Sequence, residues 1–150
     1  MNATGADAQA EPLYGTWRLL SNTRELVATG ERVDIFGQAP RGFITYGRDG
    51  RMSAIIVGDN RPKPPDLAKL TDQERAELFK TMVAYAGTFK VEGTRVLHHV
   101  DISWNENWTG SVQVRNFRFE GRRLIITAGP QIGPEDGREV IAVLTWEKVD

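Results

Sequence analysis

The sequence predicts an all-β protein in which about eight or nine antiparallel strands close into one barrel, with a single helix inserted mid-chain. Apolar and β-branched runs recur along most of the 150 residues, separated by Gly, Asn, Asp and Pro. Most joins between these runs are too short for a crossover, so neighbouring strands are antiparallel. Closure removes the unpaired edges of such a sheet and leaves room inside for side chains or one small ligand. A two-sheet sandwich is the alternative architecture.

Nine segments fit the strand pattern. They are residues 14–22, 25–35, 42–47, 51–57, 87–92, 95–104, 111–119, 123–128 and 138–148. Tight turns explain several joins, because Asp-Gly and Glu-Gly pairs end one run and begin the next at Asp49–Gly50, Glu92–Gly93 and Glu120–Gly121. Gly93 and Gly121 are expected to adopt left-handed conformations there.

One segment breaks the strand pattern. The stretch 60–66 contains three prolines and is expected to be an extended loop. Thr71 and Glu74 then have the spacing of a capping box, which predicts a helix start. Helical spacing of apolar residues follows, at Leu78, Phe79, Met82, Tyr85 and Ala86. Gly87 is a natural helix terminator, so a helix near 71–86 is predicted, covering the outer wall or an open end of the barrel.

Composition excludes several classes of protein. The 19 basic and 20 acidic residues nearly balance, so nucleic acid is not an expected partner. The absence of cysteine excludes disulfides and thiolate metal sites. Residues 1–12 are small and polar without a signal-peptide pattern, and no apolar run could span a membrane. We therefore expect a cytoplasmic protein with a flexible segment at 1–12, one domain at 13–150 and no membrane association. Strand edges that could pair between subunits leave a homodimer open.

Several motifs resemble those of a known family. The run Leu13–Leu19 is similar to the G-x-W opening strand of lipocalins. Further matching pieces are Gly42–Tyr46, Asp49–Ala54, Tyr85–Phe89, Val96–Val100, Asn107–Gly110 and Gln113–Arg115. Together they resemble the bacterial and fungal lipocalin-like domain proteins. The resemblance implies a lipocalin-type barrel in which Trp17 fills the closed end. Some barrel relatives act as cyclases or isomerases and others only bind. Glu106 stands where the family tends to have proline, which places a charge in that loop.

The chain's two histidines are adjacent, at His98 and His99. Neighbouring strand residues point to opposite faces, so the pair cannot chelate one metal ion, and no metal site is expected. His98 shares a face with apolar residues and is a candidate catalytic base, since an ordinary histidine titrates near neutral pH. The alternative is a structural histidine that hydrogen-bonds a neighbouring strand. If a bulge reverses the strand, His99 takes the place of His98 at the ligand.

Arg115 shares one side of its predicted strand with Gln113, Phe117 and Phe119. Aromatic neighbours indicate an inward face, and a buried guanidinium requires a partner. That partner is either an oxygen of a ligand, which arginine can grip with two hydrogen bonds, or an internal carboxylate. An outward-facing arginine, with the neighbouring valines inside, is a further alternative.

Aromatic and methionine side chains complete the candidate binding surface. Trp104 and Trp108 flank a short loop and either line the cavity or pack in the core. A looser group combines soft and polar character that suits an apolar ligand with one polar handle: Tyr46, Met52, Met82 and Tyr85. For Met82 and Tyr85 ordinary helix packing is the alternative.

Three functions follow from this reading. The first is a carrier that binds a small hydrophobic molecule in the barrel. The second is a cofactor-free isomerase, cyclase or lyase acting on a polyketide-, terpenoid- or fatty-acid-like molecule, with His98, Tyr46 or Arg115 as the catalytic groups. The third is an interaction module whose interior is filled. No cofactor is expected, because no Gly-rich strand-to-helix turn that could hold a phosphate is present.

Overall fold

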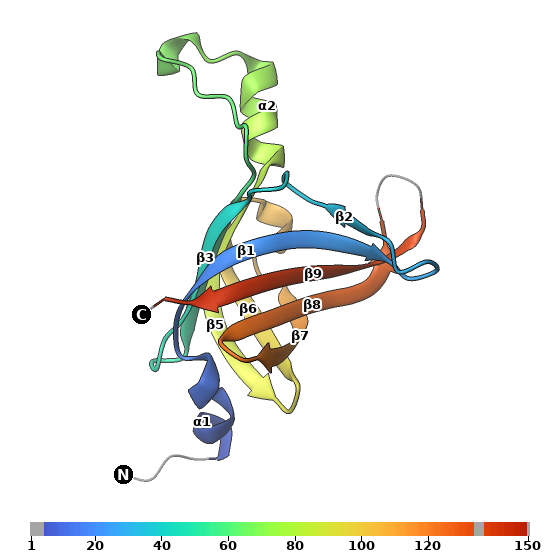
Figure 1. Ribbon diagram of the computed structural model, residues 1–150. Coiled ribbons are helices and arrows are strands. Elements are labelled where there is room, and N and C mark those ends of the chain that lie inside the picture. The colour runs from blue at the N-terminus through green and yellow to red at the C-terminus, as the bar shows by residue number, and fades with distance from the viewer. Residues whose placement is uncertain (1–4, 134–136, 150) are drawn as a thin grey trace.

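The computed structural model describes residues 5–133 and 137–149 and confirms the predicted all-β barrel (Figure 1). Nine strands make one sheet: β1 Gly15–Leu26, β2 Arg32–Asp34, β3 Arg41–Tyr46, β4 Arg51–Val57, β5 Met82–Glu92, β6 Arg95–Ser103, β7 Val112–Glu120, β8 Arg123–Ile132 and β9 Glu139–Lys148. The helices are α1 Gly5–Ala10 and α2 Asp72–Lys80, with 3₁₀ turns η1 Glu11–Leu13, η2 Leu67–Lys69 and η3 Glu106–Trp108.

The sheet closes through pairing of its first and last long strands. All neighbours are antiparallel in the order β2-β1-β3-β4-β5-β6-β7-β8-β9, and β1 also pairs with β9 from Trp17 to Leu26. On its other edge β1 pairs with β3 through residues 15–18 and with β2 through residues 23–25. The structure is therefore an eight-stranded barrel with β2 as one extra short strand.

Two of the predicted strand segments were wrong in their boundaries. The segments 14–22 and 25–35 are in fact one long strand, β1, followed by a turn and the three-residue β2. The chain reverses here because two backbone hydrogen bonds close a turn. The Leu26 amide donates to the Glu31 carbonyl at 2.8 Å, and the Gly30 amide donates to the Leu26 carbonyl at 2.7 Å. The glycines of the predicted hairpins do adopt positive φ, at 63° for Gly93 and 61° for Gly121.

The predicted helix at 71–86 is correct at its start and wrong at its end. Thr71 and Glu74 form the expected capping box, but α2 stops at Lys80. Residues 82–86 begin β5 instead, because each pairs with a residue of β4 between Val57 and Ser53. Inter-strand pairing thus overrides the helical spacing of Met82 and Tyr85. Gly87, expected to terminate the helix, lies inside β5.

Helix α2 does not cover the barrel. It projects away from the sheet at the end of a long excursion between β4 and β5 (Figure 1). None of its residues is buried. The base of the excursion is held by a hydrogen bond of 2.9 Å from the Gly58 amide to the Thr81 carbonyl. We refer to residues 59–80 as the arm.

Residues 8–13 pack against the barrel end opposite the arm. The side chain of Leu13 is fully buried, and Ala10 is buried as well. The indole Nε1 of Trp17 donates to the Leu13 carbonyl oxygen at 2.9 Å. Glu11 forms a two-pronged ion pair with Arg48 of the β3–β4 turn, at 2.8 and 2.9 Å. Part of the segment predicted as flexible therefore contacts this end of the barrel.

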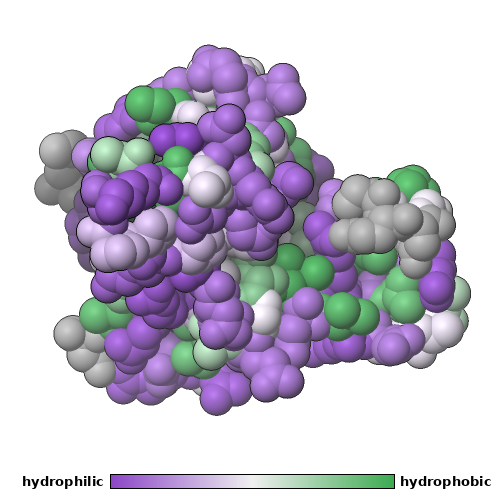
Figure 2. All heavy atoms as spheres, turned by 90° about the horizontal axis from the view of Figure 1, so that it is seen from above, coloured by the Kyte–Doolittle hydropathy of each residue, from purple (hydrophilic) through white to green (hydrophobic). Residues whose placement is uncertain are grey.

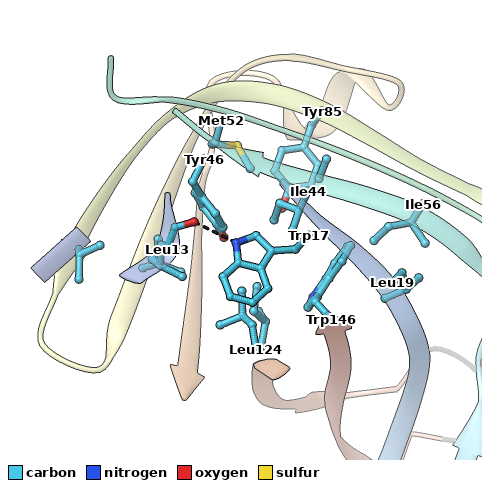
Figure 3. Close-up of a cluster of buried hydrophobic side chains, with 14 of the residues drawn as sticks. Leu13, Trp17, Leu19, Ile44, Tyr46, Met52, Ile56, Tyr85, Leu124 and Trp146 are labelled. Atoms are coloured by element: carbon cyan, nitrogen blue, oxygen red, sulfur yellow. Dashed lines mark hydrogen bonds between the residues drawn. The ribbon is translucent and has the colours of Figure 1, made fainter. Parts of the chain in front are cut away.

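The apolar core fills the same end of the barrel (Figure 3). Alternate residues of the strands point inward, as the burial of Ile44 and Tyr46 on β3 and of Met52 and Ala54 on β4 shows. Large side chains from β1, β8 and β9 meet them: Trp17, Leu19, Leu124 and Trp146. With this end packed, open space inside the barrel is left toward the arm.

Candidate functional site: a cavity at the open end of the barrel

A cavity of about 470 Å³ opens at the barrel end that carries the arm. Seen from above, apolar side chains lie in a hollow of a mainly hydrophilic surface (Figure 2). The lining comes from six of the nine strands (β1, β4, β5, β7, β8 and β9), from the segments that follow β2 and β6, and from the last turn of α2: Asn22, Arg24, Ile35, Phe36, Ile56, Phe79, Lys80, Met82, Val83, Tyr85, Trp104, Trp108, Gln113, Arg115, Ala128, Gln131, Ala142 and Leu144. A neighbouring space of about 490 Å³ beside β2 shares Arg24 and Ile35 with it, but four of its eight lining residues are charged, against three of eighteen in the barrel cavity. The barrel cavity is therefore the candidate site for an apolar molecule.

Four aromatic rings line one side of this cavity in a continuous series. The ring centroids of Phe79 and Trp104 are 6.2 Å apart, those of Trp104 and Trp108 5.2 Å, and those of Trp108 and Tyr85 5.4 Å. We call Phe79, Trp104, Trp108 and Tyr85 the aromatic wall. It runs from the arm to the buried interior, so a planar apolar ligand would meet ring faces and edges along its length.

Local hydrogen bonds hold the two tryptophans in place. Strand β6 ends at Ser103, and the Trp104 amide donates to the Ala84 carbonyl of β5 at 2.8 Å. Asn105 then caps η3 by accepting from the Asn107 amide at 3.1 Å. The Trp104 indole Nε1 is buried without a hydrogen-bond partner in the described part of the chain. The wall is thus positioned by backbone contacts and carries one unused donor.

Arg115 lies beside the wall on β7. Its guanidinium carbon sits 5.9 Å from the centre of the Trp108 ring, and one guanidinium nitrogen donates to Gln113 Oε1 at 3.3 Å. Gln113, Arg115 and Phe117 are half-buried, whereas Val112 and Val114 are exposed, so the predicted inward face of β7 is confirmed for these three residues. Phe119, assigned to the same face, is 38% exposed near the end of the strand. Within residues 5–133 and 137–149, no carboxylate forms an ion pair with Arg115. The positive charge is held by neutral groups and faces the cavity.

His98 lies below the cavity between two tyrosines. Its Nε2 is 2.8 Å from the Tyr46 hydroxyl and its Nδ1 is 2.8 Å from the Tyr85 hydroxyl. Only 1% of His98 is exposed. Burial, together with the charge of Arg115, lowers the pKa of His98 from 6.5 to about 3. At neutral pH the imidazole is therefore uncharged and both of its nitrogens are occupied.

The two tyrosines keep their protons for the same physical reason. Burial raises the pKa of Tyr85 to about 12, although the nearby Arg115 opposes this shift. Burial also raises the pKa of Tyr46 well above 10. Neither hydroxyl supplies a phenolate at neutral pH, so both act as hydrogen-bonding groups.

The structure brings together about half of the side chains that the sequence singled out. Those that line the cavity are Met82, Tyr85, Trp104, Trp108, Gln113 and Arg115. Tyr46 and His98 lie behind Tyr85, and Met52 and Phe117 pack in or against the core. Met82 and Tyr85 reach the cavity from strand β5 rather than from a helix.

The assignment of His99 to the ligand site was wrong. His99 is exposed on the outer face of β6. The irregularity in the β5–β6 pairing falls between the pairs Gly87–Val100 and Ala86–Ile102, which is beyond both histidines. The simple alternation therefore holds at this point, with His98 inside and His99 outside.

Sequence reasoning missed several residues of the lining. Ala142 and Leu144 are on the face of β9 that alternation assigns to Trp146, so that pattern could have identified them. Phe36 could not be found in this way, because it enters the site from a loop in which its own φ is +67°. Phe79 and Lys80 depend on where the arm leaves the barrel, which no local pattern encodes.

Metal and membrane features are absent from the described residues. No three His, Asp or Glu side chains of residues 5–133 and 137–149 cluster as metal ligands would. No helix in these ranges has the length and apolar character that a membrane crossing requires.

Comparisons with known proteins relate this chain to one family. A 4'-hydroxy-3'-methoxypropiophenone carrier protein of Aspergillus oryzae is 31% identical over 109 residues, which cover 65% of this chain and 96% of that protein. A solved lipocalin-like protein of Bacteroides uniformis aligns with a TM-score of 0.47 and 12% identity, over 92% of this chain and 99% of that one. The profile of the lipocalin-like domain family matches residues 14–149. The chain therefore belongs to the lipocalin-like domain family.

Proposed function

We propose that this protein is a carrier that binds a small aromatic molecule in the barrel cavity. The observation that supports it best is the aromatic wall beside a cavity of about 470 Å³, a volume typical of sites for small organic ligands. Rings of this kind provide large apolar contact with little loss of side-chain entropy. Arg115 and Gln113 add a polar region beside the aromatic wall. The other polar side chains of the lining are Asn22, Arg24, Lys80 and Gln131.

The relative from Aspergillus oryzae supports the same class of ligand. Its name describes a carrier of 4'-hydroxy-3'-methoxypropiophenone, and this chain matches 96% of its length. That compound is a flat aryl ketone with polar oxygens at both ends, so its shape suits an apolar cavity with a polar region. We use it below as a probe.

The geometry favours binding over catalysis. A general base needs a free nitrogen near the substrate, but both nitrogens of His98 are bonded to tyrosines. Its pKa of about 3 leaves it a weak base at neutral pH. We therefore propose a carrier and not the cofactor-free isomerase, cyclase or lyase.

Titration of purified protein with 4'-hydroxy-3'-methoxypropiophenone tests the proposal. Binding should quench tryptophan fluorescence saturably, and chromatography should recover the compound unchanged. The W108A variant should bind at least about 10-fold more weakly, because it removes the ring that contacts both Trp104 and Tyr85.

A matched arginine pair provides the control. R115Q should also weaken binding, by roughly 10-fold for the loss of a charged hydrogen-bond donor. R118Q changes an exposed arginine of the same strand, which pairs with Glu120, and should bind like the wild type. If wild type, W108A and R115Q bind the probe with equal affinity, the probe does not bind in the barrel cavity, which would contradict the proposal. Conversion of the probe would favour an enzyme instead.

A further inference from the structure

The triad of Tyr46, His98 and Tyr85 has one proton more than its internal hydrogen bonds can use. Each tyrosine hydroxyl carries one proton, and a neutral imidazole carries one on either Nδ1 or Nε2. The two contacts of 2.8 Å use only two of these three protons. One tyrosine must donate to the bare nitrogen, and the other must accept from the N–H and keep its own proton available.

Burial decides which tyrosine donates to the histidine. Tyr46 is 1% exposed, and its ring packs against Phe89 at 4.8 Å between centroids. Its hydroxyl has no acceptor other than His98 Nε2 among the residues that the structure describes. If Tyr46 accepted from Nε2–H, its own proton would be buried without a partner, which is unfavourable. Tyr46 therefore donates to Nε2, and His98 carries its proton on Nδ1.

The unused proton then belongs to Tyr85. His98 Nδ1–H donates to the Tyr85 oxygen, so the Tyr85 O–H remains free to donate. In contrast to Tyr46 and His98, Tyr85 lines the cavity. Over the described part of the chain no second acceptor meets its hydroxyl, so the natural partner is a group inside the cavity.

From this geometry we infer that the inner end of the cavity selects a ligand oxygen that accepts a hydrogen bond and carries no proton itself, such as a ketone oxygen. The selecting group is the Tyr85 hydroxyl, which is left free to donate because Tyr46 donates to His98 and His98 donates to Tyr85. This inference rests on the proposed function and names the ligand chemistry of the same cavity. A ligand group that can only donate hydrogen bonds, such as an ammonium cation, would be disfavoured at this end of the cavity. It would face the Tyr85 O–H, which is also a donor, and the positive charge of Arg115.

Arg115 reinforces the same preference. Its charge acts on all three members of the triad and opposes protonation of His98. It has no carboxylate partner in residues 5–133 and 137–149, so its field favours an electron-rich oxygen in the cavity. The Tyr85 hydroxyl therefore supplies the directed hydrogen bond, and the positive charge of Arg115 makes the electrostatic potential in the cavity favourable for a ligand oxygen.

The direction of the chain can be measured without any ligand. In the free wild-type protein, ¹⁵N–¹H correlation spectra of the imidazoles distinguish a protonated from a bare ring nitrogen. H99Q assigns the signals, because it removes the chain's other histidine. We expect His98 to be neutral and protonated at Nδ1. Protonation at Nε2 would overturn the inference, whether or not the protein is a carrier.

The ligand preference is measured with a matched pair of probes. 4'-Hydroxy-3'-methoxypropiophenone and 2-methoxy-4-propylphenol share one skeleton and differ in the ketone oxygen. Wild-type protein should bind the ketone about 10-fold more tightly, the contribution of one well-placed hydrogen bond at a buried donor. Y85F should abolish that ratio by weakening the ketone alone. Y14F removes the remaining tyrosine hydroxyl of the chain, which forms no hydrogen bond in the described residues, and should keep the ratio.

The outcomes separate this inference from the carrier proposal. If both probes bind wild type and Y85F with equal affinity, the carrier proposal stands and the selection by Tyr85 is refuted. If neither probe binds the wild type, the carrier proposal fails for this ligand class, and the inferred selection fails with it. An Nδ1–H tautomer combined with a ratio that Y85F removes and Y14F retains supports both.

Discussion

At the scale of single residues, His98 shows how a polar side chain is accommodated in a barrel interior. Its face of β6 also carries Val96 and Val100, which are buried. Two tyrosine hydroxyls hydrogen-bond its ring nitrogens, so burying the neutral imidazole costs little free energy. Burying the charged imidazolium in the same place would cost much more. The stability of the fold should therefore depend on the protonation of this one residue.

The sign of that dependence follows from the direction of the shift. The pKa of His98 is lowered from 6.5 to about 3 on folding, so between these values the unfolded chain binds a proton that the folded chain does not. The His98 contribution to the free energy of unfolding is complete above pH 6.5 and is lost as the pH falls toward 3. We expect a slope of about 1.4 kcal/mol per pH unit from this residue.

Urea denaturation across this pH range measures the effect. H98Q should lack this component of the slope, although its stability at pH 7 should be lower because the tyrosine hydrogen bonds are altered. H99Q changes the exposed neighbour and should retain the wild-type slope. An identical pH dependence in wild type and H98Q would show that His98 is not held neutral.

At the scale of elements, strand β5 decides how the arm joins the barrel and how the site is lined. It pairs with β4 along residues 82–88 and with β6 along residues 85–92. The β6 strand carries an extra residue opposite Ala86 and Gly87, so the two backbones approach closely at that point. Next to this point, Tyr85 hydrogen-bonds His98 at 2.8 Å and its ring centroid lies 5.4 Å from that of Trp108.

Gly87 is required for this close approach. A Cβ at this position would lie 1.8 Å from the His99 carbonyl oxygen and 2.8 Å from its carbonyl carbon. Because these are backbone atoms of a paired strand, they cannot rotate away. We expect G87A to lower the free energy of unfolding by about 3 kcal/mol.

Thermal and urea denaturation of two glycine variants tests this expectation. G133A adds the same methyl group where the nearest atom is 3.4 Å away, and it should be close to neutral. If G87A is as stable as G133A, the strands separate more easily than the structure implies.

At the scale of the whole molecule, the barrel is divided into a packed end and an open end. The packed end contains the core around Trp17 and Trp146, sealed by Leu13 (Figure 3). The open end contains the cavity, the aromatic wall and the base of the arm. None of the largest fully buried side chains, among them Leu13, Tyr46 and Trp146, lines the cavity, so we expect a ligand to bind at the open end with little rearrangement of the packed end.

This division predicts that the arm can be removed without unfolding the barrel. The hydrogen bond between Gly58 and Thr81 brings the ends of the arm together, and α2 contributes no buried residue. Replacing residues 61–79 by two glycines shortens the loop between β4 and β5. The entropic cost of closing this loop then falls by about 0.6 kcal/mol for each halving of its length, which favours the folded state slightly. We expect the midpoint of thermal unfolding to change by only a few degrees.

Circular dichroism and ligand titration of this variant give independent readings. The barrel spectrum should be retained, and binding of 4'-hydroxy-3'-methoxypropiophenone should weaken, because Phe79 is lost from the aromatic wall. Loss of near-ultraviolet signal would mean that the arm is part of the cooperative core. Unchanged affinity would exclude Phe79 from the proposed ligand contacts.

Particular residues show where sequence reasoning succeeded. Period-two alternation correctly directed His98, Gln113 and Arg115 inward, because that periodicity is a property of each strand alone. The capping box at Thr71 was predicted for the same reason, since it involves four consecutive residues. Residues 82–86 were misassigned because their apolar spacing fits a helix and a half-buried strand alike, and only pairing with β4 resolves that ambiguity.

Strand periodicity, turn glycines and the resemblance to lipocalin-like proteins were enough to predict antiparallel strands and to favour a barrel with an inward-facing histidine and arginine, while a two-sheet sandwich and an outward-facing arginine stayed open. All of these depend on residues a few positions apart. The tertiary structure alone decided that Tyr46 and Tyr85 bond the two nitrogens of His98, that the aromatic wall forms, and that α2 projects from the rim. These features join strands separated by tens of residues, and closure of the sheet, which no local pattern specifies, brings them together.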